Sequence, residues 1–322
     1  MLRSTLCRGV AAVLCLGALP AIATEPFPSR PITLVVTQGV GSGSDVVGRL
    51  IASYLGPALG QAVVVENRAG GTGIIGHQSV MRAAADGYTL LLTSTSALFI
   101  VPIINPNAKY EPSDFAPVAS VSRAPFAVLV ANTPAAPQNL AALTAALAAR
   151  PQSFASSGVG ALTHLGAELL LRRIGAQATH VPYKGSGAAL TDLASGQVLF
   201  AVDSLTAAMP LIRGGKLRAL AVSGNARAKS LPGVPTLAEA GLPGLEISAV
   251  AGLFAPKGTP SEVVDKIATA TAKALESEEV QQRFAAVETE PLVMPARAFV
   301  DLLRQEGAVW QPLVRRLEIK MD

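Results

Sequence analysis

The stretch Ile32-Thr-Leu-Val-Val36, with Val40-Gly-Ser-Gly-Ser-Asp45 shortly after it, joins a strand-like apolar run to a glycine- and serine-rich loop that opens a helix-like segment. A second loop of this kind, Ser156-Ser-Gly-Val-Gly160, follows the apolar pair Phe154-Ala155. Amide groups at a helix N-terminus carry partial positive charge, and glycine lets a ligand approach the backbone closely. The two loops therefore predict two anion-binding cradles and a small anionic ligand.

Short β-branched runs alternate with helix-length amphipathic stretches almost from end to end, which predicts an α/β fold with mainly parallel sheets. A first series of strands and helices covers Ile32 to Val36, Asp45 to Leu59, Ala62 to Glu66, Gly70 to about Ala85, and Tyr88 to Leu92. A second series covers Phe126 to Val130, Leu140 to Ala149, Phe154-Ala155, Leu165 to Arg173, Ala178 to Pro182, Leu190 to Leu193, Val198 to Val202, and Leu217 to Val222. Each series predicts one doubly wound unit.

We predict that the chain crosses between the two units twice, near residues 126 and 225. Leu253-Phe254-Ala255 has the pattern of a strand that returns to the first unit, and the helices Glu262 to Leu275 and Arg297 to Leu317 are expected to pack on it. The predicted lobe 1 therefore comprises residues 24–126 and 226–322, and the predicted lobe 2 comprises residues 127–225.

The first 23 residues have the pattern of a secretory signal peptide. Arg3 and Arg8 lie in a short basic segment, an apolar run of residues 9–19 follows, and Ala21-Ile22-Ala23 resembles a cleavage site. The apolar run is shorter than the about 20 residues that a membrane span needs, although an uncleaved anchor is the alternative. The pattern therefore predicts that the chain is exported.

Both cysteines, Cys7 and Cys15, lie in this leader, so the exported chain is expected to form no disulfide. Removing 23 of the 322 residues leaves 299, enough for about two domains with a large core, and 50% of the residues are hydrophobic. Without Arg3 and Arg8, 24 basic residues stand against 22 acidic ones in the sequence, and the chain has no cationic run. We therefore exclude nucleic acid as a partner.

Ordered segments across the mature chain carry a resemblance to a known family. They are Pro31-Ile-Thr-Leu-Val-Val36, Ser44-Asp-Val-Val47, Val63-Val-Val-Glu-Asn-Arg68, Asp86-Gly-Tyr-Thr-Leu-Leu-Leu92, Asp114-Phe-Ala-Pro-Val118, Val181-Pro-Tyr-Lys-Gly185, Ala189-Leu-Thr-Asp-Leu193, Gly215-Lys-Leu-Arg-Ala-Leu-Ala-Val222, Pro235-Thr-Leu-Ala-Glu-Ala-Gly241 and Gly252-Leu-Phe-Ala-Pro256. Together they resemble the periplasmic solute receptors of tripartite tricarboxylate transport systems. The resemblance implies a two-lobed, type II Venus-flytrap fold and a monomeric receptor, not an enzyme. Such a receptor lies in the periplasm of a Gram-negative cell, captures a small organic acid between its lobes and hands it to a membrane permease.

The candidate ligand-binding residues lie in the loops that follow predicted strands. The first loop supplies Gln38, Gly41, Ser42, Gly43, Ser44 and Asp45, and the second supplies Ser157, Gly158, Thr163 and His164. Serine hydroxyls can add donors to the loop amides, and His164 could donate to a carboxylate. The alternatives are a capped helix behind a tight turn for the first loop, with Asp45 as its cap, and a core or solvent-facing position for His164.

Further candidates follow other strands. Ser94, Thr95 and Ser96 stand where open α/β sheets place ligands. Tyr183 and Lys184 would offer a phenol and an ammonium group to the same cleft, although such a lysine is often a solvated surface group. Asp203 would face an amine, hydroxyl or water of the ligand, or else cap the following helix.

The chain departs from the family pattern in ways that bear on the ligand. Thr37-Gln38 and Gly41-Ser42 replace an aromatic residue and a second glycine in the first loop. Ala161-Leu162 stands where the second loop usually has hydroxyl donors, and Ala97 to Phe99 adds apolar bulk. An unmade hydrogen bond at a buried group costs about 1–3 kcal/mol. We therefore expect a monocarboxylic, dicarboxylic or aromatic acid instead of a tricarboxylate.

Other function classes fit the sequence less well, and no cofactor or metal is expected. A dinucleotide-dependent enzyme would need a third glycine where Ser44 stands. A hydrolase would need a Gly-x-Ser-x-Gly elbow, which the sequence lacks. His164 and Glu168 are spaced for zinc, but no second histidine stands nearby in the sequence. A receptor that signals to a sensor partner remains open as an alternative to one that feeds a permease.

Overall fold

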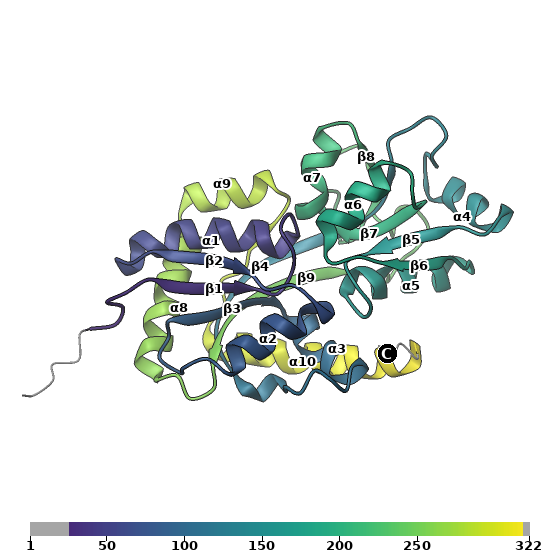
Figure 1. The fold of residues 1–322 in the computed structure, drawn as a ribbon. Helices are drawn as coiled ribbons and strands as arrows, with labels where there is room; N and C mark the ends of the chain where they lie inside the picture. The colour runs from purple at the N-terminus through teal and green to yellow at the C-terminus, as the bar shows by residue number, and fades with distance from the viewer. Residues whose placement is uncertain (1–25, 318–322) are drawn as a thin grey trace, which may run out of the picture.

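The computed structural model describes residues 26–317 and has two lobes side by side, joined by long strands (Figure 1). The strands are β1 (Ile32–Val36), β2 (Val63–Asn67), β3 (Thr89–Ser94), β4 (Phe115–Ala131), β5 (Ser153–Ser156), β6 (Thr179–Pro182), β7 (Phe200–Ser204), β8 (Leu217–Val222), β9 (Ser248–Pro256) and β10 (Glu290–Pro291). The signal peptide and its cleavage site lie outside the described residues.

The helices lie mostly between successive strands. They are α1 (Gly43–Leu59), α2 (Ile74–Met81), α3 (Thr95–Ile104), α4 (Leu140–Ala149), α5 (Leu162–Ile174), α6 (Ser186–Ala194), α7 (Leu205–Arg213), α8 (Ser261–Glu276), α9 (Glu278–Ala286) and α10 (Ala296–Leu317), with short 3-10 turns η1 (Gly71–Gly73) and η2 (Pro112–Asp114). Within residues 26–317, every helix is too short or too polar to cross a lipid bilayer.

The predicted two-lobed α/β fold is confirmed, and the sheets of the two lobes share one strand. In the first lobe the strand order is β2-β1-β3-β9-β4, and in the second it is β4-β7-β5-β6, with β8 also on β4. β1 runs parallel to β2 and β3, and β5 runs parallel to β6 and β7. β4 and β9 run antiparallel to their neighbours, so each half of the sheet is mixed.

β1 and β3 show how the sequence builds the first lobe, because helices cover both faces of its sheet (Figure 1). Side chains of a strand alternate between faces. Leu34 and Leu90 pack into the core that includes residues of α1 and α8, whereas Val35 and Leu91 pack into the core that includes residues of α2 and α3. Both strands therefore read as continuous apolar runs, as in a sheet that is buried on both sides.

The sequence missed several helices. α3 follows β3 with no intervening loop, and its residues, Thr95-Ser-Ala-Leu-Phe-Ile-Val-Pro-Ile-Ile104, are mostly apolar. A helix that is apolar on all sides shows no amphipathic period. α9 was not predicted because it starts directly after α8, at the cap residue Ser277, whose hydroxyl accepts a hydrogen bond from the Val280 amide.

Residues 223–247 pack against the second lobe. Thr236 pairs with Val222 at the end of β8, and Leu237 and Ile247 are buried in the same core as Phe126. The Ile247 carbonyl accepts a hydrogen bond from the Phe126 amide at 3.3 Å. β9 begins pairing with β4 in the first lobe only at Ser248, opposite Pro125. We therefore propose that the second crossing lies near residue 247 and not near residue 225.

Replacing Ile247 with alanine tests this assignment, because its side chain is 2% exposed in the core of the second lobe. We expect Ile247→Ala to lower the free energy of unfolding by about 2–5 kcal/mol in a urea titration. The control is Val293→Ala, at a side chain that is 42% exposed, which should change stability by less than about 0.5 kcal/mol. Equal, small effects of both variants would contradict the placement of residue 247 in this core.

Candidate functional site

A cavity of about 110 Å³ lies between the lobes, where both half-sheets present the carboxyl ends of parallel strands. The first lobe contributes residues that follow β1 and β3 and the turn η1, and the second contributes residues that follow β5, β6 and β7. Lys184 and Asp203 are the charged residues among those that line it. The position is the one at which α/β sheets bind ligands.

Several helices point their N-termini at this cavity. Gly43 and Ser44 of α1, Leu162 and Thr163 of α5, Ser186 of α6 and Thr206 of α7 line it together with Ser94, the cap of α3. The first amides of a helix have no acceptor within the helix. For the amides of Gly43, Ser44, Leu162 and Thr163, the described residues provide no other acceptor. The cavity wall is therefore electropositive on both sides without an arginine.

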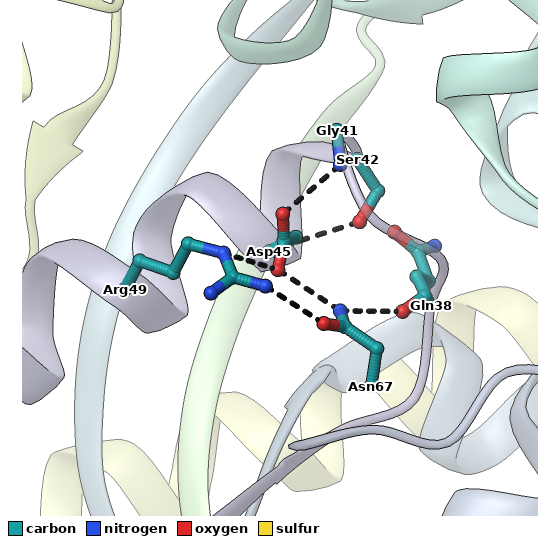
Figure 2. A network of polar contacts seen from close by, with 6 residues as sticks. All are labelled: Gln38, Gly41, Ser42, Asp45, Arg49 and Asn67. Atoms are coloured by element: carbon teal, nitrogen blue, oxygen red, sulfur yellow. Dashed lines mark hydrogen bonds and ion pairs between the residues drawn. The ribbon is translucent and has the colours of Figure 1, made fainter. Parts of the chain in front are cut away.

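The first loop is held by an internal carboxylate (Figure 2). Asp45 is 3% exposed; its Oδ2 accepts the Gly41 amide at 3.0 Å, and its Oδ1 accepts Asn67 Nδ2 at 2.9 Å and pairs with Arg49 Nε at 3.0 Å. The Asp45 amide donates to Ser42 Oγ at 3.1 Å. Burial alone would raise the pKa of Asp45, but the Gly41 amide, Arg49 and Asn67 together lower it. Gly41, Ser42 and Asp45 thus shape the loop instead of lining the cavity.

The second loop is also closed by its own side chains. The Ser157 amide donates to Thr163 Oγ1 at 2.9 Å, and the Gly160 amide donates to His164 Nδ1 at 3.0 Å. The His164 ring stacks on His180, with the ring centroids 3.7 Å apart, and does not line the cavity. Burial and then His180 lower the pKa of His164 to about 3. A neutral His164 therefore fixes the loop by accepting a hydrogen bond.

In the remaining predicted loops, too, some residues line the cavity and others only support the loop. Ser94 lines the cavity and caps α3, with Oγ accepting the Ala97 amide at 3.2 Å. Thr95 and Ser96 are buried behind it. Tyr183 lines the cavity, and its hydroxyl donates to Asp192 Oδ2 at 2.8 Å.

The structure thus brings most of the predicted site residues together at the cavity wall: Gln38, Gly43, Ser44, Ser94, Ser157, Gly158, Thr163, Tyr183, Lys184 and Asp203. It places the others outside the wall: Gly41, Ser42, Asp45, Thr95, Ser96 and His164. Contact with a ligand stays a prediction for the residues of both groups.

Sequence reasoning missed part of the wall. Thr72, Phe126, Ser186, Ser204 and Thr206 also line the cavity. Ser186 and Ser204 could have been found, because each stands at a helix start just after a strand, as Ser44 and Ser94 do. Thr72 has no such signal; it lies in η1 with a φ of 53°.

No group of three or more His, Cys, Asp or Glu side chains within residues 26–317 is arranged to hold a metal ion. His164 Nε2 lies 3.8 Å from Glu168 Oε1, which is the pair with zinc-like spacing in the sequence.

Comparisons with known proteins agree with this geometry. The sequence model of the tripartite tricarboxylate transporter family receptor matches residues 47–319. BugT of Bordetella pertussis (strain Tohama I) is 37% identical over 309 residues, which are 95% of this chain and 94% of that protein. An R. palustris protein with adipate superimposes with a TM-score of 0.87 at 33% identity, over 91% of this chain and 99% of that one. MatC from Rhodopseudomonas palustris with bound malate has a TM-score of 0.83 at 32% identity, over 89% and 100%.

The buried histidine rings should not titrate near neutral pH. Burial lowers the pKa of His77 and of His180 to about 4, and burial together with His180 lowers that of His164 to about 3. We expect imidazole NMR signals to stay in the neutral form from pH 8 to pH 5.5. The free energy of unfolding should fall as the pH drops from about 6.5 towards 4, because the unfolded chain then takes up protons that the folded rings do not bind.

An added exposed ring provides the control for this titration. Ala148→His places a histidine at an exposed position of α4, and its signal should titrate near about 6.5. A native histidine that titrates alongside it would show that the ring is not buried as described.

Proposed function

Because the chain belongs to the tripartite tricarboxylate transporter receptor family, a family of substrate-binding receptors, we propose that it binds a small organic carboxylate between its lobes and delivers it to a membrane permease. The observation that carries this proposal is the meeting of unpaired helix N-terminal amides from both lobes at one cavity. Amides of Gly43 and Ser44 from the first lobe and of Leu162 and Thr163 from the second can donate to the two ends of one anion.

The class of acid follows from the number of donors that remain available. In the second loop the amides of Ser157, Gly158 and Gly160 already donate to side chains of the protein. Ala161 and Leu162 add carbon to the wall, as does Phe126. A tricarboxylate would leave charged oxygens unpaired at about 1–3 kcal/mol each. We therefore propose an acid with one or two carboxylates, and the relatives with malate and adipate support the smaller class.

Closure of the lobes is proposed to hold the ligand. The Thr72 hydroxyl of the first lobe donates to the Val159 carbonyl of the second at 2.7 Å. A Cβ added to Gly187 of α6 would lie 2.7 Å from the Val40 carbonyl oxygen, so the backbones of the two lobes meet closely. Such contacts are made only when the lobes are together. A ligand that touches both lobes would therefore stabilise the closed arrangement through a hinge at the β4 and β9 crossings.

Delivery to a permease places the receptor in the periplasm, in agreement with the predicted signal peptide of residues 1–23. Affinity capture from an envelope fraction in the presence and absence of the bound acid distinguishes a permease from a sensor protein as partner.

Ligand binding is tested first by a thermal-shift screen and then by titration calorimetry. We expect a monocarboxylate or dicarboxylate at a hundred times its dissociation constant to add about 2.7 kcal/mol of stability. For a chain of this length the midpoint should rise by several degrees. Tight binding of citrate with no response to the smaller acids would reverse the proposed ligand class, and no response to any acid would reject the proposed function.

Gly187→Ala separates closure from folding. The added methyl group would collide with the Val40 carbonyl only when the lobes are together, and alanine is at least as favourable as glycine in a helix. A misfit of this kind costs about 1–3 kcal/mol, so the affinity for the acid should fall about tenfold to a hundredfold while the unliganded protein keeps its stability.

Gly233→Ala is the matched control, because nothing lies within 4 Å of a Cβ at that position. Calorimetry and urea titration of both variants give the two readouts. Unchanged affinity in Gly187→Ala would show that binding does not require the observed approach of the lobes.

A further inference from the structure

Asp203 is a buried carboxyl group in the wall of the cavity that the protein itself does not fully pair. It lies in β7, one residue before Ser204, the cap of α7, and is 2% exposed. Its Oδ1 accepts the Ser204 amide at 2.7 Å, whereas its Oδ2 has no hydrogen-bond partner within 3.5 Å among the described residues. The Ser186 hydroxyl is close enough to favour the ionised carboxylate but does not reach hydrogen-bond distance. A buried oxygen of this kind is rarely left unpaired in a native structure.

A structural role as a helix cap does not explain Asp203. The cap of α7 is Ser204, whose Oγ accepts the Ala207 amide at 3.3 Å. None of the ion pairs among the described residues includes Asp203. Lys184, the other charged residue of the wall, is exposed. The free oxygen therefore points to a partner that comes from outside the chain.

The charge of Asp203 decides which partner fits. Burial raises the pKa of Asp203 to about 6, although the nearby Ser186 and Ser204 act to lower it. At pH 8 the group is ionised and can only accept hydrogen bonds. A carboxylate of the ligand placed directly against Oδ2 would be repelled, whereas a hydroxyl or ammonium group would be attracted.

We propose that the ligand carries a hydrogen-bond donor, a hydroxyl or ammonium group, beside its carboxylate and that this donor binds Asp203 Oδ2. The inference rests on the proposed function and narrows it to hydroxy acids and amino acids. The helix N-termini bind the carboxylate, and Asp203 accepts a hydrogen bond from the hydroxyl or ammonium group next to it. A site built around a buried polar group rejects a ligand that leaves this group unpaired.

The test compares acids that differ at one atom. The dicarboxylic set is succinate, malate and aspartate, which carry hydrogen, hydroxyl and ammonium, respectively, at the same carbon. The monocarboxylic set is propanoate, lactate and alanine, which differ in the same way. Both enantiomers of each chiral acid are titrated by calorimetry at pH 8. In the set that binds, we expect the hydroxy or amino acid to bind at least about tenfold more tightly than the parent acid.

Asp203→Asn then assigns the preference to this residue. Asparagine keeps an oxygen for the Ser204 amide but can replace Oδ2 with a donor, so the preference over the parent acid should fall at least about tenfold. A urea titration of the unliganded variant shows whether it is folded, independently of any change in how the cavity binds the parent acid. Asp265→Asn, at an exposed position of α8, is the matched control and should change nothing.

Two outcomes overturn the inference and are distinct from failure of the proposed function. Equal binding of parent and substituted acids to the native protein would overturn it while leaving a carboxylate receptor. A preference that survives in Asp203→Asn would place the recognition elsewhere. If no acid of either set or of the wider screen binds, the proposed function itself fails. If Asp203→Asn does not fold, the affinities of the native protein for the parent and substituted acids still test whether the ligand needs a hydrogen-bond donor.

Discussion

Helices in this protein begin where parallel strands end, and this shared polarity gathers unpaired amide groups at the inner edge of each lobe. α1 and α3 follow β1 and β3 in the first lobe, and α5, α6 and α7 follow β5, β6 and β7 in the second. Because first-turn amides lack acceptors within their helices, each needs a partner from elsewhere. Residues of both lobes line the same cavity, so the unpaired amides of both lobes meet there.

The loops that carry these amides stay in shape because their polar groups bond to one another. Asp45 neutralises part of the Arg49 charge and holds the Gly41 amide, so the first loop is fixed before a ligand arrives (Figure 2). His164 does the same for the Gly160 amide without carrying charge. Groups that look like ligand contacts in the sequence are therefore often the supports of those contacts.

The sequence predicted most strands of both lobes, because short apolar runs such as those of Leu34 and Leu90 are a local property of the chain. It did not predict β10 or the part of β4 before Phe126. It also indicated the strand ends at which the cavity forms. It could not distinguish Ser44, which lines the cavity, from Ser42, which caps α1. The distinction depends on the residue at which the helix starts, and either serine suits a cap. Nor could it predict that His164 stacks on His180, since that contact joins α5 to β6. The packing of residues 223–247 on the second lobe likewise depends on long-range contacts of Leu237 and Ile247.

Both connections between the lobes run through strands that are hydrogen-bonded to each other, with Pro125 of β4 opposite Ser248 of β9. A two-stranded ribbon resists stretching and sideways shear but tolerates twist. The connection between the lobes therefore depends on backbone pairing between β4 and β9 and not on the loops that line the cavity. A change in a loop side chain therefore alters the cavity wall without touching the backbone pairs that join the lobes, so the selectivity of the cavity and the geometry of the connection depend on different residues.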